Sequence, residues 1–189
     1  YDVAAELLEI YAKRESQKGF SYPKPNDSYS SFVSSFAFEE TPDQIKTMND
    51  VLLDMQSEKP MDRLVCGDVG FGKTEIAIRA VFHAFTNNKK SIVLAPTTLL
   101  SQQLFSCFSQ RLLSFGCKVN QISRLTQKNK RSISSFINEK TDVLIGTHSI
   151  IKNPEVLSKA SLLIVDEEHR FGVKDKEKIM SFSPHCNYL

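Results

Sequence analysis

The chain has 189 residues, of which 41% are hydrophobic and 24% are charged, and its formal net charge is +2. This balance is typical of a globular protein with room for one full domain and an appendage, and it leaves little room for two independent domains. The small net charge excludes a global basic field, so a surface for nucleic acid would have to be local.

Neither a membrane span nor a secretory signal is present in the sequence. No apolar run reaches the length of a membrane span, and the N-terminus lacks a basic segment followed by an apolar core. We therefore expect a cytoplasmic protein with no membrane partner.

The first 36 residues predict an appendage followed by a linker. Residues 2–17 carry Val3, Leu7, Ile10 and Tyr11 at helical spacing among charged residues, which predicts an amphipathic helix that needs a partner surface. The serine- and proline-containing stretch that follows predicts a loop with at most a short helix near 29–33. We divide the chain into a connecting helix over 1–18, a linker over 19–36 and a main domain over 37–189.

A helix start is predicted at Thr41, where threonine caps, Pro42 takes the first helical position and Gln44 reaches back to the cap. Phe38 and Gln44 also suggest a base-binding pair, since a side-chain amide can read an adenine edge through its donor and acceptor. Gln44 would then select ATP. The alternative is that Gln44 only completes the capping box and that Phe38 is a hydrophobic staple.

From Arg63 onward, short apolar runs alternate with helical patterns. The predicted strands cover residues 63–66, 91–95, 118–122, 142–146 and 162–166, and the predicted helices lie near 73–86, 98–114 and 127–139. Apolar strands separated by helices predict an α/β domain with a doubly wound parallel sheet that is covered on both faces. In such sheets the ligand binds beyond the C-terminal ends of the strands.

A complete phosphate-binding pattern, G-x-x-x-x-G-K-T, lies between the first of these strands and the helix after it. It comprises Gly67, Asp68, Val69, Gly70, Phe71, Gly72, Lys73 and Thr74. Glycines let backbone N–H groups approach phosphate oxygens, and the helix N-terminus adds a positive partial charge. Lys73 can contact the β and γ phosphates, and the Thr74 hydroxyl can hold Mg²⁺.

The last predicted strand ends in three acids and a histidine, Asp166, Glu167, Glu168 and His169. A carboxylate at a strand end beside a phosphate loop can hold Mg²⁺, and the next can polarise the attacking water. We assign Asp166 to the metal and Glu167 to the base. Glu168 is interpreted as structural, and His169 either relays to another surface or hydrogen-bonds within the turn.

Two further strand ends carry polar groups, in the segments 95–103 and 146–148. Hydroxyl groups, amides and helix N-termini commonly contact phosphodiesters without reading sequence. Thr97 or Thr98 could equally be a helix cap. The cysteines at 66, 107, 117 and 186 form no C-x-x-C pair, which predicts reduced and mostly buried thiols, although a surface metal contact at His185 and Cys186 stays open.

The ordered motifs F-x-x-T-P-D-Q, G-D-V-G-F-G-K-T, A-P-T-T-L-L, I-G-T-H and D-E-E-H-R-F-G resemble those of superfamily 2 helicases and translocases. Within this superfamily the chain looks most like the bacterial transcription-repair coupling factors. Fork-reversing RecG helicases have a similar phosphate loop and a similar H-R-F-G segment. Phe71, Glu168 and the Ser123-Arg124 pair favour the coupling factors.

The resemblance implies a RecA-like P-loop lobe of an ATP- and Mg²⁺-dependent translocase on double-stranded DNA, which acts on stalled RNA polymerase and recruits excision-repair proteins. Gln44 would contact adenine, Lys73 and Thr74 the phosphates and Mg²⁺, and Asp166 and Glu167 the metal and the water. The residues expected along the DNA backbone are Thr97, Thr98, Gly146, Thr147 and His148. The alternatives are a RecG-like lobe for branched DNA and a P-loop ATPase that does not act on DNA.

A second RecA-like domain with arginine fingers is absent from this sequence, as are domains for polymerase and repair proteins. Because arginine fingers can contribute several orders of magnitude to hydrolysis, we expect little or no ATPase activity from the chain alone. The start at Tyr1 and the end at Leu189, just as a strand begins near Asn187, suggest a piece of a longer protein. In folds of this kind, that strand lies between the 63–66 strand and the acidic strand.

Overall fold

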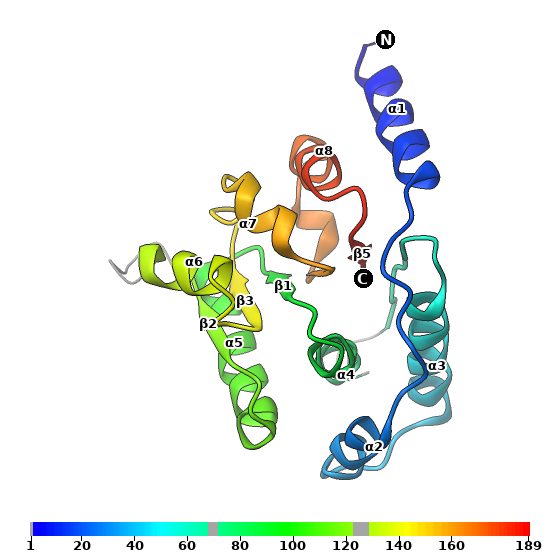
Figure 1. The fold of residues 1–189 in the computed structure, drawn as a ribbon, viewed down its shortest axis with the longest axis vertical. Coiled ribbons are helices and arrows are strands. Elements are labelled where there is room, and N and C mark those ends of the chain that lie inside the picture. The colour runs from blue at the N-terminus through cyan, green and yellow to red at the C-terminus, as the bar shows by residue number, and fades with distance from the viewer. Residues whose placement is uncertain (1, 68–71, 123–128) are drawn as a thin grey trace.

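The computed structural model describes residues 2–67, 72–122 and 129–189. Its centre is a five-stranded parallel sheet in the order β2-β3-β1-β4-β5, with helices on both faces (Figure 1). The strands are β1 Ser91–Leu94, β2 Val119–Gln121, β3 Val143–Gly146, β4 Leu162–Val165 and β5 Asn187–Tyr188. The predicted doubly wound α/β fold is confirmed.

The helices of the main domain match the predicted positions to within a few residues, and two further helices follow β3 and β4. The α-helices are α1 Asp2–Ser16, α2 Asp27–Ser34, α3 Pro42–Gln56, α4 Lys73–Thr86, α5 Thr98–Leu112, α6 Asn129–Ile137, α7 Pro154–Lys159 and α8 Val173–Phe182. Two short 3₁₀ turns, Leu113–Phe115 and Glu168–Arg170, complete the described elements. None of these helices is both long enough and apolar enough to cross a membrane.

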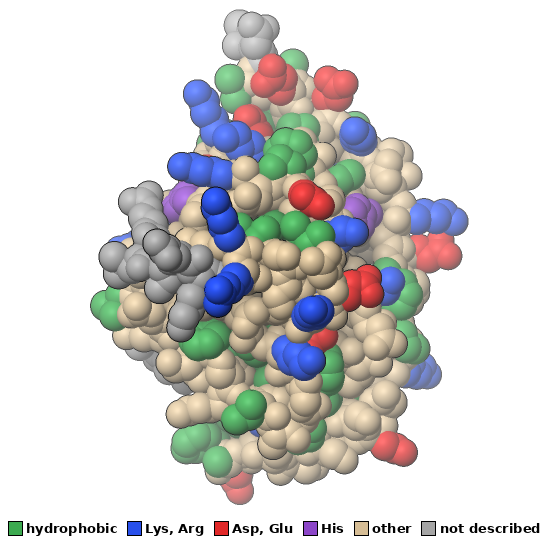
Figure 2. Space-filling model, turned by 60° about the vertical axis from the view of Figure 1, so that its left-hand side comes forward, with side chains coloured by type: hydrophobic (Ala, Val, Ile, Leu, Met, Phe, Trp, Pro, Cys, Tyr) green, Lys and Arg blue, Asp and Glu red, His purple; other side chains and the backbone are tan. Residues whose placement is uncertain are grey.

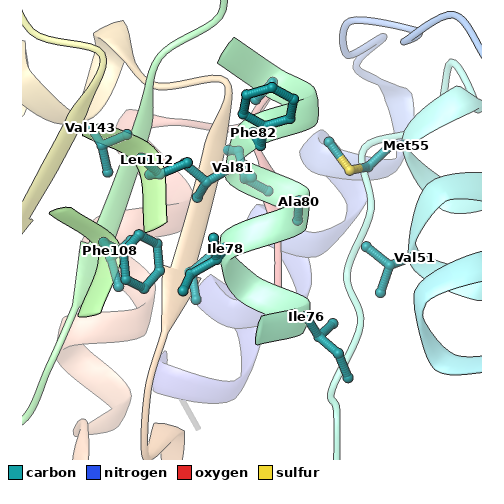
Figure 3. Close-up of a cluster of buried hydrophobic side chains, with 14 of the residues drawn as sticks. Val51, Met55, Ile76, Ile78, Ala80, Val81, Phe82, Phe108, Leu112 and Val143 are labelled. Carbon is teal, nitrogen blue, oxygen red and sulfur yellow. The ribbon is translucent and has the colours of Figure 1, made fainter. Parts of the chain in front are cut away.

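One face of the sheet is covered by α4 and α5, and α3 packs against α4. Figure 3 shows α4 at the centre of this layer, with Ile78 and Val81 directed toward Phe108 and Leu112 of α5, and with Met55 of α3 on its other side. Burial on both sides explains why α4 is nearly all apolar after its first turn. The helix that begins at Lys73 is therefore held firmly in the core.

The opposite face is covered by α6, α7 and α8. Ile92, Leu144 and Leu163 from three neighbouring strands point into this second cluster, where they meet Phe136 of α6 and Ile179 of α8. Alternate residues of each strand thus serve the two faces, as expected for a sheet buried on both sides.

The strand register brings three C-terminal strand ends to one edge. Leu94 at the end of β1 lies opposite Gly146 of β3 and Val165 of β4. The hydrogen bonds continue one residue further, because Ala95 N donates to Gly146 O at 2.8 Å and Asp166 N donates to Leu94 O at 2.9 Å. The segments that follow these three strands therefore leave the sheet side by side.

The strand predicted over residues 63–66 is wrong, since this segment forms no strand. Only an isolated bridge joins Asp62 to Tyr188, and Arg63 N donates to Tyr188 O at 3.1 Å. No strand pairing is present over residues 63–66, and Leu64 is 69% exposed. β5 itself lies between β4 and this segment, which confirms the position predicted for the strand near Asn187.

Helix α1 docks through Arg14, which the helical pattern had placed among solvent-facing residues. The guanidinium donates to Cys186 O at 2.8 Å and to Met61 O at 2.6 Å, and it lies over the Tyr188 ring at 3.9 Å. Val3 and Tyr11, expected on the buried face, are 56% and 45% exposed. The docked face of α1 therefore runs along Leu7, Ile10 and Arg14, which are at least partly buried.

The segment expected to be a linker contributes large side chains to the core. Tyr22, Tyr29 and Phe32 are buried in the same cluster as α4, and the Phe32 ring stacks on Phe82 with centroids 4.1 Å apart. The cysteines are free, with Cys117 and Cys186 buried, Cys107 partly buried and Cys66 exposed. Two of the four thiols are therefore fully buried. The exposed thiol, Cys66, lies in the segment before the phosphate loop that pairs with none of the described strands.

Candidate functional site

The phosphate side of the site is the start of α4. Gly72 precedes the helix with φ = 82°, a left-handed conformation that favours glycine. Lys73 is the first helical residue and is exposed, and Thr74 follows it half-buried. The N-terminus of this helix and the exposed ammonium of Lys73 point to an anion site at this end. Asp68, Val69, Gly70 and Phe71 lie outside the described residues.

The acidic side is the end of β4. The pKa of Asp166 is raised, mainly because burial disfavours its charged form and secondly because of the neighbouring Glu167 carboxylate. Backbone hydrogen bonding and the Lys73 ammonium act in the opposite direction. A cation beside Asp166 would offset this penalty on its ionised form.

Glu167 turns the chain away from the sheet in a left-handed conformation, with φ = 52°. Its carboxylate Oε2 lies 3.3 Å from Nε2 of His169, whose side chain is 73% exposed. Glu168 pairs with Lys176 of α8, which agrees with the structural role expected for it. This contact corresponds to one of the two interpretations of His169, namely a hydrogen-bonding role within the turn.

The two sides face one cavity of about 390 Å³. Its lining includes Gly67, Lys73 and Thr74 from the phosphate side and Asp166 and Glu167 from the acidic side. Apolar residues of α4, α5 and β4 complete the wall, namely Ile76, Ala77, Leu104, Phe108 and Ile164. The fold thus brings together residues that are about ninety positions apart in the sequence, at the expected edge of the sheet.

Carboxylate and hydroxyl oxygens are suited to Mg²⁺, which is usually held by one or two protein ligands together with substrate phosphates. Asp166 and Thr74 supply such oxygens to this cavity. In the described part of the chain, no group of three or more His, Cys, Asp or Glu side chains could hold a metal by itself, and this includes the surroundings of His185 and Cys186.

Gln44 lies against the end of the phosphate loop and also caps α3. Thr41 N donates to Gln44 Oε1 at 2.9 Å, and Gln44 N donates to Thr41 Oγ1 at 3.2 Å, so the predicted capping box is confirmed. A Cβ built on Gly72 would stand only 2.4 Å from Gln44 Nε2. Phe38 is 75% exposed and its ring contacts Phe36, so it does not act as a staple on α3.

The residues expected along DNA have different surroundings. Thr97 caps α5, where its Oγ1 accepts from Leu100 N at 3.2 Å, and Thr98 is half-buried. Thr147 is only 6% exposed. His148 stacks on Phe171 with centroids 4.5 Å apart, and its Nε2 lies 3.2 Å from Asp175 Oδ2.

Gly146 has a packing role, since a Cβ there would stand 2.7 Å from Ile150 Cδ1. Among the three threonines expected along DNA, Thr97 is exposed, Thr98 is half-buried and Thr147 is buried.

A set of paired charged residues that the sequence motifs did not predict lies beside Gln44, formed by Glu40, Glu75, Arg79 and Arg111, of which Arg79 is buried and the others are partly buried. A signal was present, because Arg79 lies in the most apolar stretch of α4 and Glu75 precedes it by four residues. A charged residue on a buried helix face needs partners, and Glu75 was the nearest candidate.

Comparisons with known proteins agree with this architecture. The family model described as DEAD/DEAH box helicase matches residues 41–186. The chain is 47% identical over 180 residues to the transcription-repair-coupling factor of Borreliella burgdorferi, covering 94% of this chain and 16% of that protein. It is also 47% identical over 190 residues to the transcription-repair-coupling factor of Escherichia coli, covering 100% and 17% respectively.

Among solved structures, that of RecG bound to a three-way DNA junction superposes with a TM-score of 0.79 at 29% identity, covering 90% of this chain and 24% of that one. The chain spans about a sixth of the length of each of the two transcription-repair-coupling factors named above.

Proposed function

Because the chain belongs to the DEAD/DEAH box helicase family, we propose that it is the nucleotide-binding lobe of an ATP-dependent translocase on double-stranded DNA. The observation that carries this proposal is the single cavity shared by Lys73, Thr74, Asp166 and Glu167. A helix N-terminus with a lysine on one side of a cavity and two carboxylates on the other side suit a nucleoside triphosphate with its metal ion.

Each residue would have a distinct role. The α4 N-terminus and Lys73 bind the phosphates, and Thr74 and Asp166 would hold Mg²⁺, which neutralises charge that develops on the phosphates during transfer. Glu167 would accept a proton from the attacking water, because its exposed carboxylate lies at the cavity wall. Gln44, adjoining Gly72, would contact the adenine edge, with the exposed ring of Phe38 nearby in sequence to stack on the base.

Contact with DNA would occur at the sheet edge where β1 and β3 end. Thr97 is exposed there at the N-terminus of α5, an arrangement that suits a phosphodiester oxygen. On the face in Figure 2, basic side chains lie among acidic and hydrophobic ones and form no continuous band. Binding would therefore depend on local contacts from Thr97, Thr98 and the 146–148 segment rather than on a broad positive field.

The similarity to transcription-repair-coupling factors supports a role in moving stalled RNA polymerase and recruiting excision-repair proteins. Those contacts would belong to other parts of a longer protein. A second RecA-like domain would close the nucleotide site and supply arginine fingers, so this lobe alone would bind nucleotide but turn over little of it. The 29% identity to RecG supports the second candidate, a motor lobe for branched DNA.

The proposal is tested by fluorescent-nucleotide binding to the purified chain and by ATPase assays of the longer motor with and without duplex DNA. We expect Lys73→Ala to weaken binding, and we expect Glu167→Gln to keep binding while abolishing DNA-stimulated hydrolysis in the motor. ATPase activity that ignores duplex DNA would contradict the DNA translocase and favour a P-loop ATPase with another substrate. Stimulation by branched but not by linear duplexes would favour the RecG-like candidate.

A further inference from the structure

Four charged side chains, which we term the charge network, lie next to Gln44; one of them is buried and three are partly buried. They are Glu40, Glu75, Arg79 and Arg111. Arg79 pairs through Nη1 with Glu40 and through Nε with Glu75 Oε1 at 3.0 Å. Arg111 contacts both carboxylate oxygens of Glu75, with Nη2 2.5 Å from Oε1 and Nε 3.1 Å from Oε2. The side chains of Arg79 and Glu75 are only 6% and 11% exposed.

The charge network joins three elements around the nucleotide site. Glu40 directly precedes the N-cap of α3, Glu75 and Arg79 belong to α4, and Arg111 belongs to α5. The Arg79–Glu40 pair is therefore an ionic link between the residue before the N-cap of α3 and the helix that begins at Lys73. Arg111 adds a hydrogen bond from Nη1 to Ser35 Oγ at 2.8 Å, which ties the segment before Glu40 to the same cluster.

Gln44 is held between the charge network and the phosphate loop. Its Oε1 accepts from Thr41 N, and its Nε2 lies against Gly72. A cavity of about 10 Å³, the size of a single water, is lined by Glu40, Gln44, Gly72 and Arg79 among others. A shift of Glu40 would move Thr41 and with it the oxygen end of the Gln44 amide.

Stability alone does not account for this arrangement. Buried ion pairs are often no more stabilising than well-packed apolar residues of similar volume. Arg79 Nη2 is buried and has no hydrogen-bond partner in the described part of the chain, which adds a desolvation cost. An apolar side chain in the same stretch of α4 would avoid that cost but could not hold Glu40.

We propose that Arg79 is a positioning residue that, through Glu40, orients the Gln44 amide and thereby sets the preference for an adenine over a guanine nucleotide. This rests on the proposed function, because it requires a nucleotide in the cavity. Adenine presents a donor and an acceptor on its N6/N7 edge, whereas guanine presents two acceptors at O6 and N7. An amide whose oxygen is fixed complements adenine and places that oxygen against an acceptor of guanine.

The test compares binding of ATP, GTP and inorganic tripolyphosphate to the wild-type chain and to Glu40→Ala and Arg79→Lys. Lysine keeps the charge of Arg79 but presents no fork that reaches both Glu40 and Glu75. We expect ATP affinity to fall roughly tenfold in both variants, with GTP and tripolyphosphate affinities within about twofold. The matched control is Asp50→Ala, which removes the exposed 3.1 Å ion pair between Asp50 and Lys46 within α3. This change should leave the affinities for all three ligands unchanged.

An equal loss of affinity for all three ligands would overturn the proposal, because it would indicate general damage to α4. An unchanged preference for ATP over GTP in the two variants would overturn it as well. A wild-type chain that binds none of the three ligands contradicts the proposed function instead. The positioning claim is then decided by hydrogen exchange of the Thr41 and Gln44 amides. Their exchange should quicken in Glu40→Ala but not in Asp50→Ala, and equal protection in both variants would overturn the proposal.

Discussion

The phosphate side and the acidic side of the cavity are held in different ways. Asp166 extends β4, which pairs with β1 on one side and β5 on the other, and strain appears only at the next residue, Glu167. The approach to Gly67 forms no strand, although Arg63 N donates to Tyr188 O and Tyr188 N donates to Met61 O. Side chains add to these two backbone bonds, since Arg14 donates to Met61 O and Asn187 Oδ1 accepts from Met61 N at 2.6 Å. The acidic side is thus fixed by the sheet, whereas the phosphate side depends on contacts with α1 and β5.

The largest effect should follow from Arg14→Ala. This change leaves the carbonyl group of Cys186 without its donor, removes one of the two donors to Met61 O and takes the guanidinium from the Tyr188 ring. We expect a loss of about 3 kcal/mol in the free energy of unfolding, measured by urea denaturation. Lys13→Ala, an exposed neighbour on α1, should change it by less than about 0.5 kcal/mol. Equal effects of the two changes would mean that α1 does not support the phosphate side.

Lys73→Ala should separate binding from stability. Lys73 is exposed and makes no ion pair with the described residues, so the folded state loses little when it is removed. A charged donor to phosphate is worth about 2–3 kcal/mol, which predicts a roughly hundredfold loss of nucleotide affinity in a fluorescence titration. Lys46→Ala serves as the exposed-lysine control. An unchanged nucleotide affinity in Lys73→Ala would show that the phosphate side does not bind the nucleotide through Lys73.

Glu167→Gly tests the strain on the acidic side. Relief of the left-handed conformation, less the entropy that glycine loses on folding, predicts a gain of up to about 1 kcal/mol in the free energy of unfolding. Glu139→Gly is the matched control, because Glu139 has φ = 63° and lies outside the cavity lining. Both changes should stabilise the fold, and only Glu167→Gly should impair hydrolysis in the motor. Destabilisation by Glu167→Gly would show that its side-chain contacts outweigh the backbone strain.

The smallest effect concerns Asp166 and pH. Its pKa in the folded state lies above the ordinary value of 3.8, so protonation favours the fold and that contribution is lost as the pH rises through the raised pKa. Asp166→Asn should therefore raise the melting temperature slightly at neutral pH, corresponding to a gain of less than about 1 kcal/mol in the free energy of unfolding. It should also flatten the change of the melting temperature with pH above the ordinary pKa of 3.8. A lower melting temperature at pH 7 would contradict this assignment.

Much of the fold could be predicted because apolar runs determine it locally. The stretch from Lys73 to Thr86 was correctly predicted as a helix, and four of the five predicted strands occur within a residue or two. The strand predicted at 63–66 does not form, because a strand needs a paired neighbour and in the described part of the chain only the Asp62–Tyr188 bridge joins this segment to β5. A local apolar pattern carries no information about whether a neighbouring strand pairs with it.

Within the site, Lys73, Thr74, Asp166 and Glu167 meet in one cavity, as their motifs had indicated. Arg14 and Arg79 could not be placed in the same way, because charged residues are usually exposed. The acceptors of Arg14 lie up to 172 positions away in the sequence. Glu40, the partner of Arg79, belongs to another part of the chain, directly before the N-cap of α3. Such partners are set by tertiary packing rather than by periodicity.

The phosphate and acidic sides are predicted to act together on one Mg²⁺–nucleotide complex. The most direct measurement is the affinity of a non-hydrolysable ATP analogue, with Mg²⁺ and with chelator, in the wild-type chain and in Asp166→Asn. We predict that Mg²⁺ strengthens binding in the wild type and that this enhancement disappears in Asp166→Asn, while binding without Mg²⁺ is retained. An equal Mg²⁺ enhancement in both proteins would contradict the claim.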